Sequence, residues 1–315
     1  MYSKLKIFTG NANKELASEV AKFAGIPIGD ADVFKFSNDN SFVKINENVR
    51  GADTFIIQPT CYPVNDSLME LLIMIDALKR ASAQRINCVI PYFGYARSDK
   101  KDQPGVPITA KLVADLLTTA GAHRIVAMDL HADQIQGFFN IPVDHLDAIP
   151  TFARYFKSTF DLSDVVVVSP DTGGTARARK FAKRLNCSLA IGDKRRTGND
   201  GNAEILNIIG DVEGKTAILF DDIIDTGGSL TKMAELLSKK GVKKVYAACA
   251  HGILAGKAVE RIENSPIEKL FITNSIPLSA EKASCEKIEQ LSIAEMLALS
   301  IKKIHIEESL SVLFR

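Results

Sequence analysis

The sequence predicts an α/β protein of two domains, each a mostly parallel sheet flanked by helices. Short β-branched runs alternate with segments that carry apolar residues at helical spacing, which is the pattern of a parallel sheet. The 315 residues are about twice the typical length of one domain, roughly 150 residues. The two halves of the chain also show the same order of elements, which suggests an internal duplication.

The first half is expected to run in a β-α-β-α-β order. A helix is predicted from Ser67 to about Ser82, with Asn65 or Asp66 as its cap, because apolar residues form one stripe along it. Strand Ile86–Pro91, a second helix that ends at Gly121 and strand Ile125–Met128 follow. The apolar stripes of the two helices consist of Leu68, Leu71, Leu72, Ile75 and Leu78, and of Ile108, Leu112, Val113, Leu116 and Leu117.

The second half repeats this alternation after a boundary near residues 145–150. We therefore expect domains at residues 1–147 and 148–315. The predicted elements are a helix to about Phe160, strand Val165–Val168, helix Ala176–Leu185, strands Leu189–Ile191 and Thr216–Phe220, helix Leu230–Lys240 and strand Lys244–Ala248.

Composition excludes several classes of protein. The 39 Lys and Arg residues balance 38 Asp and Glu residues, so the net charge of +1 argues against a dedicated nucleic-acid or membrane-surface protein. No apolar run approaches the ~18 residues that a transmembrane helix needs, and we expect a cytoplasmic protein. The five cysteines are widely spaced and form no C-x-x-C motif, which predicts buried free thiols rather than disulfides or a zinc site.

The segment Thr216–Ser229 is the most informative motif. A predicted strand runs into Asp221 and Asp222, then into hydroxyl and glycine residues that precede a helix. Glycines let backbone N–H groups approach a phosphate, and the start of a helix adds positive partial charge. Carboxylates beside a phosphate site suggest sugar hydroxyls or Mg²⁺ as their partners. The alternative is a helix-capping turn with solvated acids.

A second loop of this kind, Ser169–Thr175, precedes a helix with basic side chains, Arg177 among them. Asp171 in this loop and His131 at the end of another predicted strand are candidates to share one Mg²⁺, together with Asp129. The alternative for a lone histidine is a structural role. The carboxyl ends of strands are, however, where open α/β sheets bind ligands.

Two basic segments are candidates for contacts with a polyphosphate. The long polar loop Arg97–Pro107 carries Lys100 and Lys101, and Lys194-Arg-Arg196 precedes a polar loop at 197–202. Cations of this kind can stabilise charge on a transferring phosphoryl group. Solvated basic turns are the alternative, and a nucleic-acid site is a weaker one.

With these loops in view, the chain resembles the ribose-phosphate diphosphokinases (phosphoribosyl pyrophosphate synthetases) of the bacterial and animal class nearly from end to end. The matching segments are Gly10–Asn13, Asn46–Gly51, Asn65–Asp76, Met128–Phe139, the two loops above and Asn207–Val212. The resemblance implies two phosphoribosyltransferase-like domains, transfer of the β,γ-diphosphoryl group of ATP to the 1-hydroxyl of ribose 5-phosphate, Mg²⁺ as cofactor and a homohexamer.

The resemblance also implies roles for individual residues. Lys194 and Arg196 would stabilise the transferring group, and His131, Asp171 and Asp129 would serve the metal. The residues implied for ATP are Phe36, Asn38, Asp39, Asn40, Arg97, Ser98, Lys100 and Lys101, with Phe36 of a neighbouring subunit stacking on adenine. The residues implied for ribose 5-phosphate are Arg196, Asp221, Asp222, Asp225, Thr226, Gly227, Gly228 and Ser229.

The departures from the family pattern lie on the ATP side. Asn40, Ser98 and Gly105 stand where the family usually has glutamate, glutamine and arginine. They leave open a catalytically weak paralogue that regulates an active synthetase by assembling with it as a sister subunit. A phosphoribosyltransferase is a third hypothesis, and the Tyr95-Ala-Arg97 loop argues against it.

Overall fold

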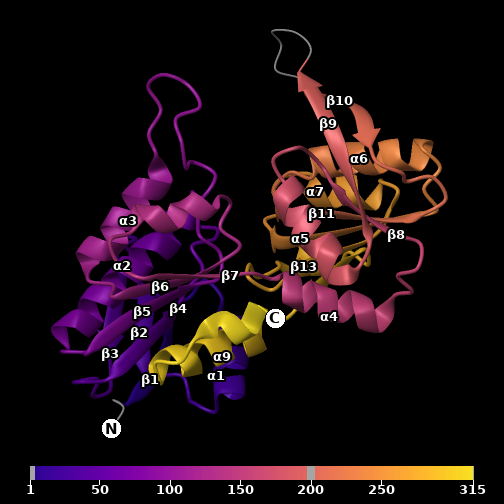
Figure 1. Ribbon diagram of the computed structural model, residues 1–315. Coiled ribbons are helices and arrows are strands. Elements are labelled where there is room, and N and C mark those ends of the chain that lie inside the picture. The colour runs from indigo at the N-terminus through magenta and orange to yellow at the C-terminus, as the bar shows by residue number, and fades with distance from the viewer. Residues whose placement is uncertain (1–3, 197–202, 315) are drawn as a thin grey trace. The chain divides into compact units, whose positions relative to one another are not determined.

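The computed structural model describes residues 4–196 and 203–314 (Figure 1). The chain forms two compact units. Unit 1 contains Met1–Asp147, Ser275–Pro277 and Ser292–Arg315, and unit 2 contains Ala148–Asn274 and Leu278–Leu291. The expected domain of residues 148–315 thus differs from unit 2 at its C-terminal end, because the last helix packs within unit 1.

Unit 1 is built on a five-stranded parallel sheet of order β1-β4-β5-β6-β7. Consecutive strands of this sheet lie side by side, so every crossover proceeds in the same direction. The strands are β1 (Leu5–Thr9), β4 (Asp53–Ile57), β5 (Arg85–Ile90), β6 (Arg124–Met128) and β7 (Val143–Leu146). Helices α1 (Lys14–Ala24), α2 (Val64–Arg80) and α3 (Thr109–Ala120), the 3-10 helix η1 (Asp133–Phe138) and an antiparallel hairpin of β2 (Ala31–Lys35) and β3 (Ser41–Ile45) complete the unit.

The predicted helices of unit 1 are present, with one correction. Gly121 ends α3 at a φ of 120°, as its position in the sequence predicts. Helix α2 begins at Val64 instead of Ser67, and neither Asn65 nor Asp66 caps it through a side chain. Both residues lie in its first turn, where the negative charge of Asp66 is favourable to the helix dipole.

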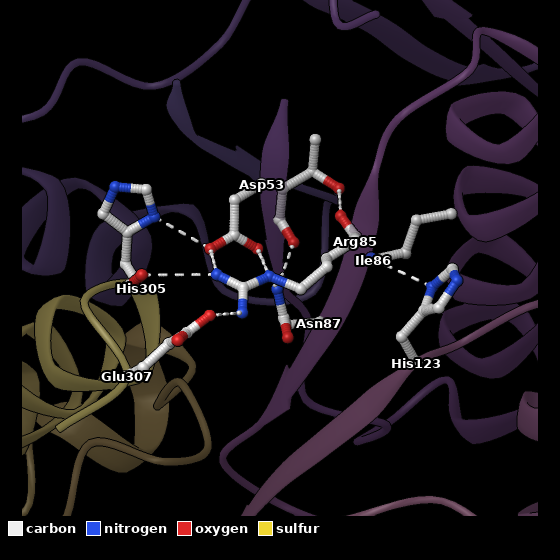
Figure 2. Close-up of polar contacts among 8 residues, drawn as sticks. Asp53, Arg85, Ile86, Asn87, His123, His305 and Glu307 are labelled. Atoms are coloured by element: carbon white, nitrogen blue, oxygen red, sulfur yellow. Dashed lines mark hydrogen bonds and ion pairs between the residues drawn. The ribbon is translucent and has the colours of Figure 1, made fainter. Parts of the chain in front are cut away.

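The C-terminal helix α9 (Ala294–His305) packs on α1, and Figure 2 shows the polar contacts that hold its end. Asp53, at the start of β4, is fully buried and accepts hydrogen bonds from Arg85 Nε (3.0 Å) and Asn87 Nδ2 (2.8 Å). His305 Nδ1 lies 2.8 Å from the other oxygen of Asp53. Arg85 also donates to the His305 carbonyl, so the buried charge of Asp53 at the amino end of β4 holds the end of the last helix.

Unit 2 is built on a seven-stranded sheet of order β10-β9-β8-β11-β12-β13-β14, parallel except for the β9–β10 pair. Its strands are β8 (Val165–Ser169), β9 (Ser188–Arg196), β10 (Ala203–Ile209), β11 (Thr216–Ile224), β12 (Lys244–Gly252), β13 (Ile267–Thr273) and β14 (Ile288–Leu291). Its helices are α4 (Ile149–Thr159), α5 (Thr175–Leu185), α6 (Gly228–Lys239), α7 (Ala258–Glu263) and α8 (Ala280–Ala283).

The strand order of unit 2 reverses between β8 and β11. Helix α5 leads from β8 to β9 on one side, whereas α6 leads from β11 to β12 on the other. A crevice forms at such a switch point, outside the carboxyl ends of the two strands, and open α/β sheets bind their ligands there. The two glycine-containing loops singled out in the sequence are the ones that follow β8 and β11.

The mixed α/β class with mostly parallel sheets, which the sequence predicts, is confirmed by both units.

An aromatic cluster of Phe152, Phe156, Phe181, Phe220 and Phe271 fills one side of the unit 2 sheet, with Phe181 and Phe220 stacked at 4.2 Å between ring centroids. All five cysteines are free. Across residues 4–196 and 203–314, no helix is long and apolar enough to cross a membrane.

Candidate active site

The loop after β8 is organised around Asp171. Ser169 Oγ donates to the Asp171 carbonyl at 2.6 Å, and the Gly174 N–H donates to Asp171 Oδ1 at 3.0 Å. No side chain caps α5, which begins at Thr175, so its first N–H groups face the carboxyl end of β8. A Cβ atom at Gly174 would lie 3.7 Å from Oδ1 of Asp171 and 3.7 Å from Oδ1 of Asp221. The Asp171 loop therefore lies against the acidic pair of β11.

The acidic pair belongs to β11 itself, which continues to Ile224 beyond the predicted end at Phe220. Pairing with β12 extends from Asp221 with Cys249 to Ile224 with Gly252 and holds this part of the strand. The two carboxylates differ in exposure: the Asp221 side chain is 26% exposed and that of Asp222 is 5% exposed.

Arg177 of α5 reaches both carboxylates. Its Nη1 lies 2.9 Å from Asp222 Oδ1 and 3.8 Å from Asp221 Oδ1. The Asp222 N–H donates to Asp221 Oδ1 at 2.9 Å. Burial, the charge of Asp222 and the charge of Asp171 together raise the pKa of Asp221 to about 8. The site thus brings carboxyl groups close together around one guanidinium, and burial and their mutual repulsion favour a proton on Asp221.

The loop after β11 leads into a helix start that no side chain caps. Gly227 adopts a left-handed φ of 74° and precedes α6, which begins at Gly228. Gly228 and Ser229 therefore lie in the first turn of the helix, where backbone N–H groups are available to an anion. Arg261 Nη1 donates to the Thr226 carbonyl at 2.7 Å and holds the loop from α7. Unit 2 brings together Asp171, Asp221 and Asp222 with this loop.

In unit 1, the hairpin turn between β2 and β3 carries the residues expected to bind adenine. The Phe36 N–H donates to the Asn40 carbonyl, and Asp39 adopts a left-handed φ of 69°. Asn38 Oδ1 accepts from the Asn40 N–H at 3.2 Å. Lys35 Nζ contacts Asp39 and, at 2.8 Å, Asp66 of α2, which fastens the hairpin to the unit.

Phe36 belongs to a small aromatic group on this hairpin. Its ring centroid lies 5.3 Å from those of Phe34 and Phe42, in edge-to-face geometry. Phe36 is nevertheless 49% exposed. The hairpin therefore presents an aromatic surface whose neighbours limit its motion, which suits stacking on a base.

The loop that follows β5 exposes its cations. Arg97, Lys100 and Lys101 are exposed, and Ser98 is half-buried. Asp99, which the sequence analysis did not single out, is buried and faces Gln134 of η1 at 3.5 Å. Tyr95 adopts a left-handed φ of 65° and donates through its hydroxyl to Asn65 of α2. Asp99 and Tyr95 thus anchor the loop whose cations remain accessible.

The turn after β6 places Asp129 and His131 differently. Asp129 is buried with a strained φ of 40°, and its N–H donates to the Leu146 carbonyl. His131 is exposed. His145 of β7 accepts the Leu130 N–H through Nε2 at 2.9 Å, so it holds the turn that carries both candidates. Sequence reasoning missed His145, since only strand pairing brings it there.

Lys194 and Arg196 lie at the end of β9. In the antiparallel pair with β10, Lys194 faces Ile205 and Arg196 faces Ala203. Their side chains lie outside the described part of the structure. Over the residues that the structure describes, no group of three or more His, Cys, Asp and Glu side chains could hold a metal ion.

Comparison with known proteins identifies the family. Residues 5–121 match the N-terminal domain of ribose phosphate pyrophosphokinase, and residues 200–315 match the phosphoribosyl synthetase-associated domain. The ribose-phosphate pyrophosphokinase of Caldanaerobacter subterraneus is 56% identical over 99% of this chain and 98% of its own. The chain belongs to the ribose-phosphate pyrophosphokinase family.

Two further relatives agree with this membership. The ribose-phosphate pyrophosphokinase of Clostridium perfringens is 57% identical over 99% of this chain and 98% of its own length. The crystal structure of phosphoribosylpyrophosphate synthetase from Mycobacterium smegmatis has a TM-score of 0.91 and 43% identity, and covers 96% of this chain and 99% of its own. The family resemblance inferred from the sequence is therefore confirmed over nearly the full length of the chain.

Proposed function

We propose that this chain is a ribose-phosphate diphosphokinase, which transfers the β,γ-diphosphoryl group of ATP to the 1-hydroxyl of ribose 5-phosphate and yields phosphoribosyl pyrophosphate and AMP. One observation carries the proposal. Strand β11 carries an acidic pair near its carboxyl end, and an uncapped helix start follows the strand at the switch point of unit 2. The carboxylates can accept hydrogen bonds from sugar hydroxyls, and the N–H groups at the helix start can bind a phosphate.

Ribose 5-phosphate is proposed to bind along this strand end. The N–H groups of Gly227, Gly228 and Ser229 and the hydroxyls of Thr226 and Ser229 receive the 5-phosphate. Asp221 and Asp222 accept hydrogen bonds from ribose hydroxyls. Asp225 lies in the same loop, where its carbonyl accepts the Ala255 N–H and thereby fixes the backbone. This orientation leaves the 1-hydroxyl, at the opposite end of the sugar from the 5-phosphate, as the nucleophile.

The ATP-binding residues are proposed to come from the hairpin and the long loop of unit 1. Phe36 of a neighbouring subunit stacks on adenine, with the Asn38–Asn40 turn beside the base. Arg97, Ser98, Lys100 and Lys101 bind the polyphosphate. Lys194 and Arg196 stabilise charge on the diphosphoryl group as the bond to AMP breaks, and Arg196 also binds the sugar phosphate. Catalysis then consists of positioning and charge stabilisation.

Mg²⁺ fits the carboxylates of unit 2 as a partner of the substrate. Proteins usually hold Mg²⁺ through one or two carboxylates together with substrate phosphates, so a dedicated cage of side chains is not required. Asp171 is the proposed ligand in unit 2. Asp129 and His131, which the family resemblance also implies as ligands, belong to unit 1. When bound, the ion neutralises charge on the transferring phosphates.

The decisive experiment measures AMP release by the purified chain with ATP, ribose 5-phosphate and Mg²⁺. Sugar-dependent AMP and phosphoribosyl pyrophosphate are expected, with loss in Lys194→Ala. Omission of ribose 5-phosphate is the control for simple ATP hydrolysis. An inert wild-type protein would refute the proposal, and activity that appears only with an active sister subunit would favour the regulatory paralogue.

We also propose that the enzyme is a homohexamer, as the family resemblance implies. Sedimentation velocity of the wild-type protein tests the assembly directly. A monomer at the enzyme's working concentration would overturn this part of the proposal and, with it, the stacking of adenine on Phe36 of a neighbouring subunit.

A further inference from the structure

Arg177 contacts the acidic pair of β11, but the proposed reaction assigns it no role. It lies in the first turn of α5, and its side chain is 20% exposed. The Arg177 side chain therefore points from α5 toward the acidic pair at the switch point. Arg179, two residues later, lies on the opposite side of the helix and is exposed. The same helix thus offers two arginines of which one contacts the acidic pair.

The contact with Asp222 is the closer one. Nη1 of Arg177 lies 2.9 Å from Asp222 Oδ1, a charge-assisted hydrogen bond, and the same nitrogen is 3.8 Å from Asp221. Asp222 is nearly inaccessible to water, so its charge depends on a partner. The planar guanidinium also fixes the direction in which that carboxylate points.

The backbone of Asp222 is fixed as well. Cys249 Sγ donates to its carbonyl at 3.2 Å, and its N–H donates to Asp221 Oδ1. Residues 221–224 pair with β12 around it. With the main chain held on both sides, the side-chain torsions are the freedom that remains, and Arg177 limits them.

We propose that Arg177 is a positioning residue for sugar recognition: it holds Asp222 in the orientation that accepts a hydrogen bond from a ribose hydroxyl, and so sets the preference for ribose over deoxyribose phosphates. This inference rests on the proposed binding of ribose 5-phosphate at β11. A site built to bind a hydroxyl rejects a sugar without it, because the buried carboxylate is then left unpaired. A carboxylate released from Arg177 loses that geometry and the discrimination with it.

The test is calorimetric binding of ribose 5-phosphate and of 2-deoxyribose 5-phosphate to the full chain. In Arg177→Gln we expect the affinity for ribose 5-phosphate to fall about ten- to hundredfold, the effect of losing one charged hydrogen bond. The affinity for 2-deoxyribose 5-phosphate should fall less, so that the ratio between the sugars shrinks. Arg179→Gln is the matched control and should leave both affinities unchanged.

Two further variants separate positioning from folding. Arg177→Lys keeps the charge and should retain part of the discrimination. In Asp222→Asn, adding Arg177→Gln should change the ribose 5-phosphate affinity by less than it does in the wild type, because both changes act through one carboxylate. Equal losses for the two sugars in Arg177→Gln, or fully additive effects in the double variant, would overturn the inference.

Direct binding also separates this inference from the proposed reaction. A wild-type chain that binds ribose 5-phosphate but releases no AMP would refute the diphosphokinase activity and leave the sugar ratios to decide the role of Arg177. A wild-type chain that shows no preference between the two sugars would overturn the role of Arg177 whatever its activity.

Discussion

His305 Nδ1 lies 2.8 Å from Oδ2 of Asp53, a contact between residues 252 positions apart in the sequence (Figure 2). Asp53 is fully buried, and its other oxygen is bound by Arg85 and Asn87. The four side chains form one charged network between the first sheet and the last helix. Its stabilising effect depends on every member being paired.

Asp53→Asn is therefore expected to lower the free energy of unfolding of unit 1 by about 3 kcal/mol, since it leaves Arg85 beside a neutral group. The matched control is Glu307→Gln, because Glu307 also contacts Arg85 at 3.5 Å but its side chain is 72% exposed. The control should change stability by less than about 1 kcal/mol. Urea unfolding, with hydrogen exchange of α9 as a local measure, checks both, and equal effects of the two variants would contradict the assignment.

Asp221 predicts a pH dependence of stability. Its pKa in the folded chain, about 8, exceeds the ordinary value of 3.8, so the folded protein holds a proton that the unfolded chain releases. The contribution of this proton to stability is complete below about pH 4 and is lost as the pH rises through about 8. Without ligand, Asp221→Asn should gain stability relative to the wild type between pH 5 and pH 9.

Thermal melts at the two pH values measure this difference. Asp161→Asn is the control, because hydrogen bonds from Ser163 lower the pKa of the exposed Asp161 carboxyl, which stays ionised over that range. Between pH 5 and pH 9, the melting temperature of Asp161→Asn should change by the same amount as that of the wild type. If the melting temperature of Asp221→Asn also changes by the same amount as that of the wild type, Asp221 is already ionised in the free protein at pH 5.

The cysteines predict an order of thiol reactivity. Burial raises the pKa of Cys88 and Cys249, both of which are inaccessible to solvent, whereas Cys187 is half-buried. Brief treatment with N-ethylmaleimide at pH 7.5 should modify Cys187 first, as measured by peptide mass spectrometry. All five should react after unfolding in guanidinium, and early modification of Cys249 in the native protein would contradict the packing beside Asp222.

Phe36→Ala tests the role of the hairpin. If Phe36 stacks on adenine, its loss should raise the KM for ATP about five- to hundredfold, with the KM for ribose 5-phosphate unchanged, because stacking contributes about 1–3 kcal/mol per base. Phe23→Ala is the control, since Phe23 is similarly exposed on α1. Steady-state kinetics with each substrate varied in turn measures both, and a matching rise in Phe23→Ala would remove the evidence for stacking.

The sequence predicts much of the framework because local patterns determine it. The apolar stripe of α2, the glycine after α3 and the strand, loop and helix order around Asp171 and Asp221 follow from spacing alone. The end of β11 was predicted too early, because alternation does not reveal that residues 221–224 pair with β12. The start of α2 was missed for a similar reason, since a residue suited to capping can also lie within the first turn.

The partners of the site residues were harder to predict. Arg177 was visible in the sequence only as one basic residue on a helix, and His145 only as a residue of a short strand. Each acquires its role through a contact that the tertiary fold creates: Arg177 with Asp222, and His145 with the Leu130 N–H. Side-chain contacts between separate elements depend on strand order and register, which a single sequence does not supply.

The return of residues 292–315 to unit 1 has a consequence for synthesis on the ribosome. The chain of unit 2 is complete at Leu291, before the residues of α9 have been made. Domains generally fold as units from the N-terminus onward during translation. Here unit 1 starts first but receives its last residues after unit 2, because Asp53 and Arg85 have no His305 to contact until α9 has been made. A nascent chain truncated before α9 should therefore contain a folded unit 2 and an incompletely folded unit 1.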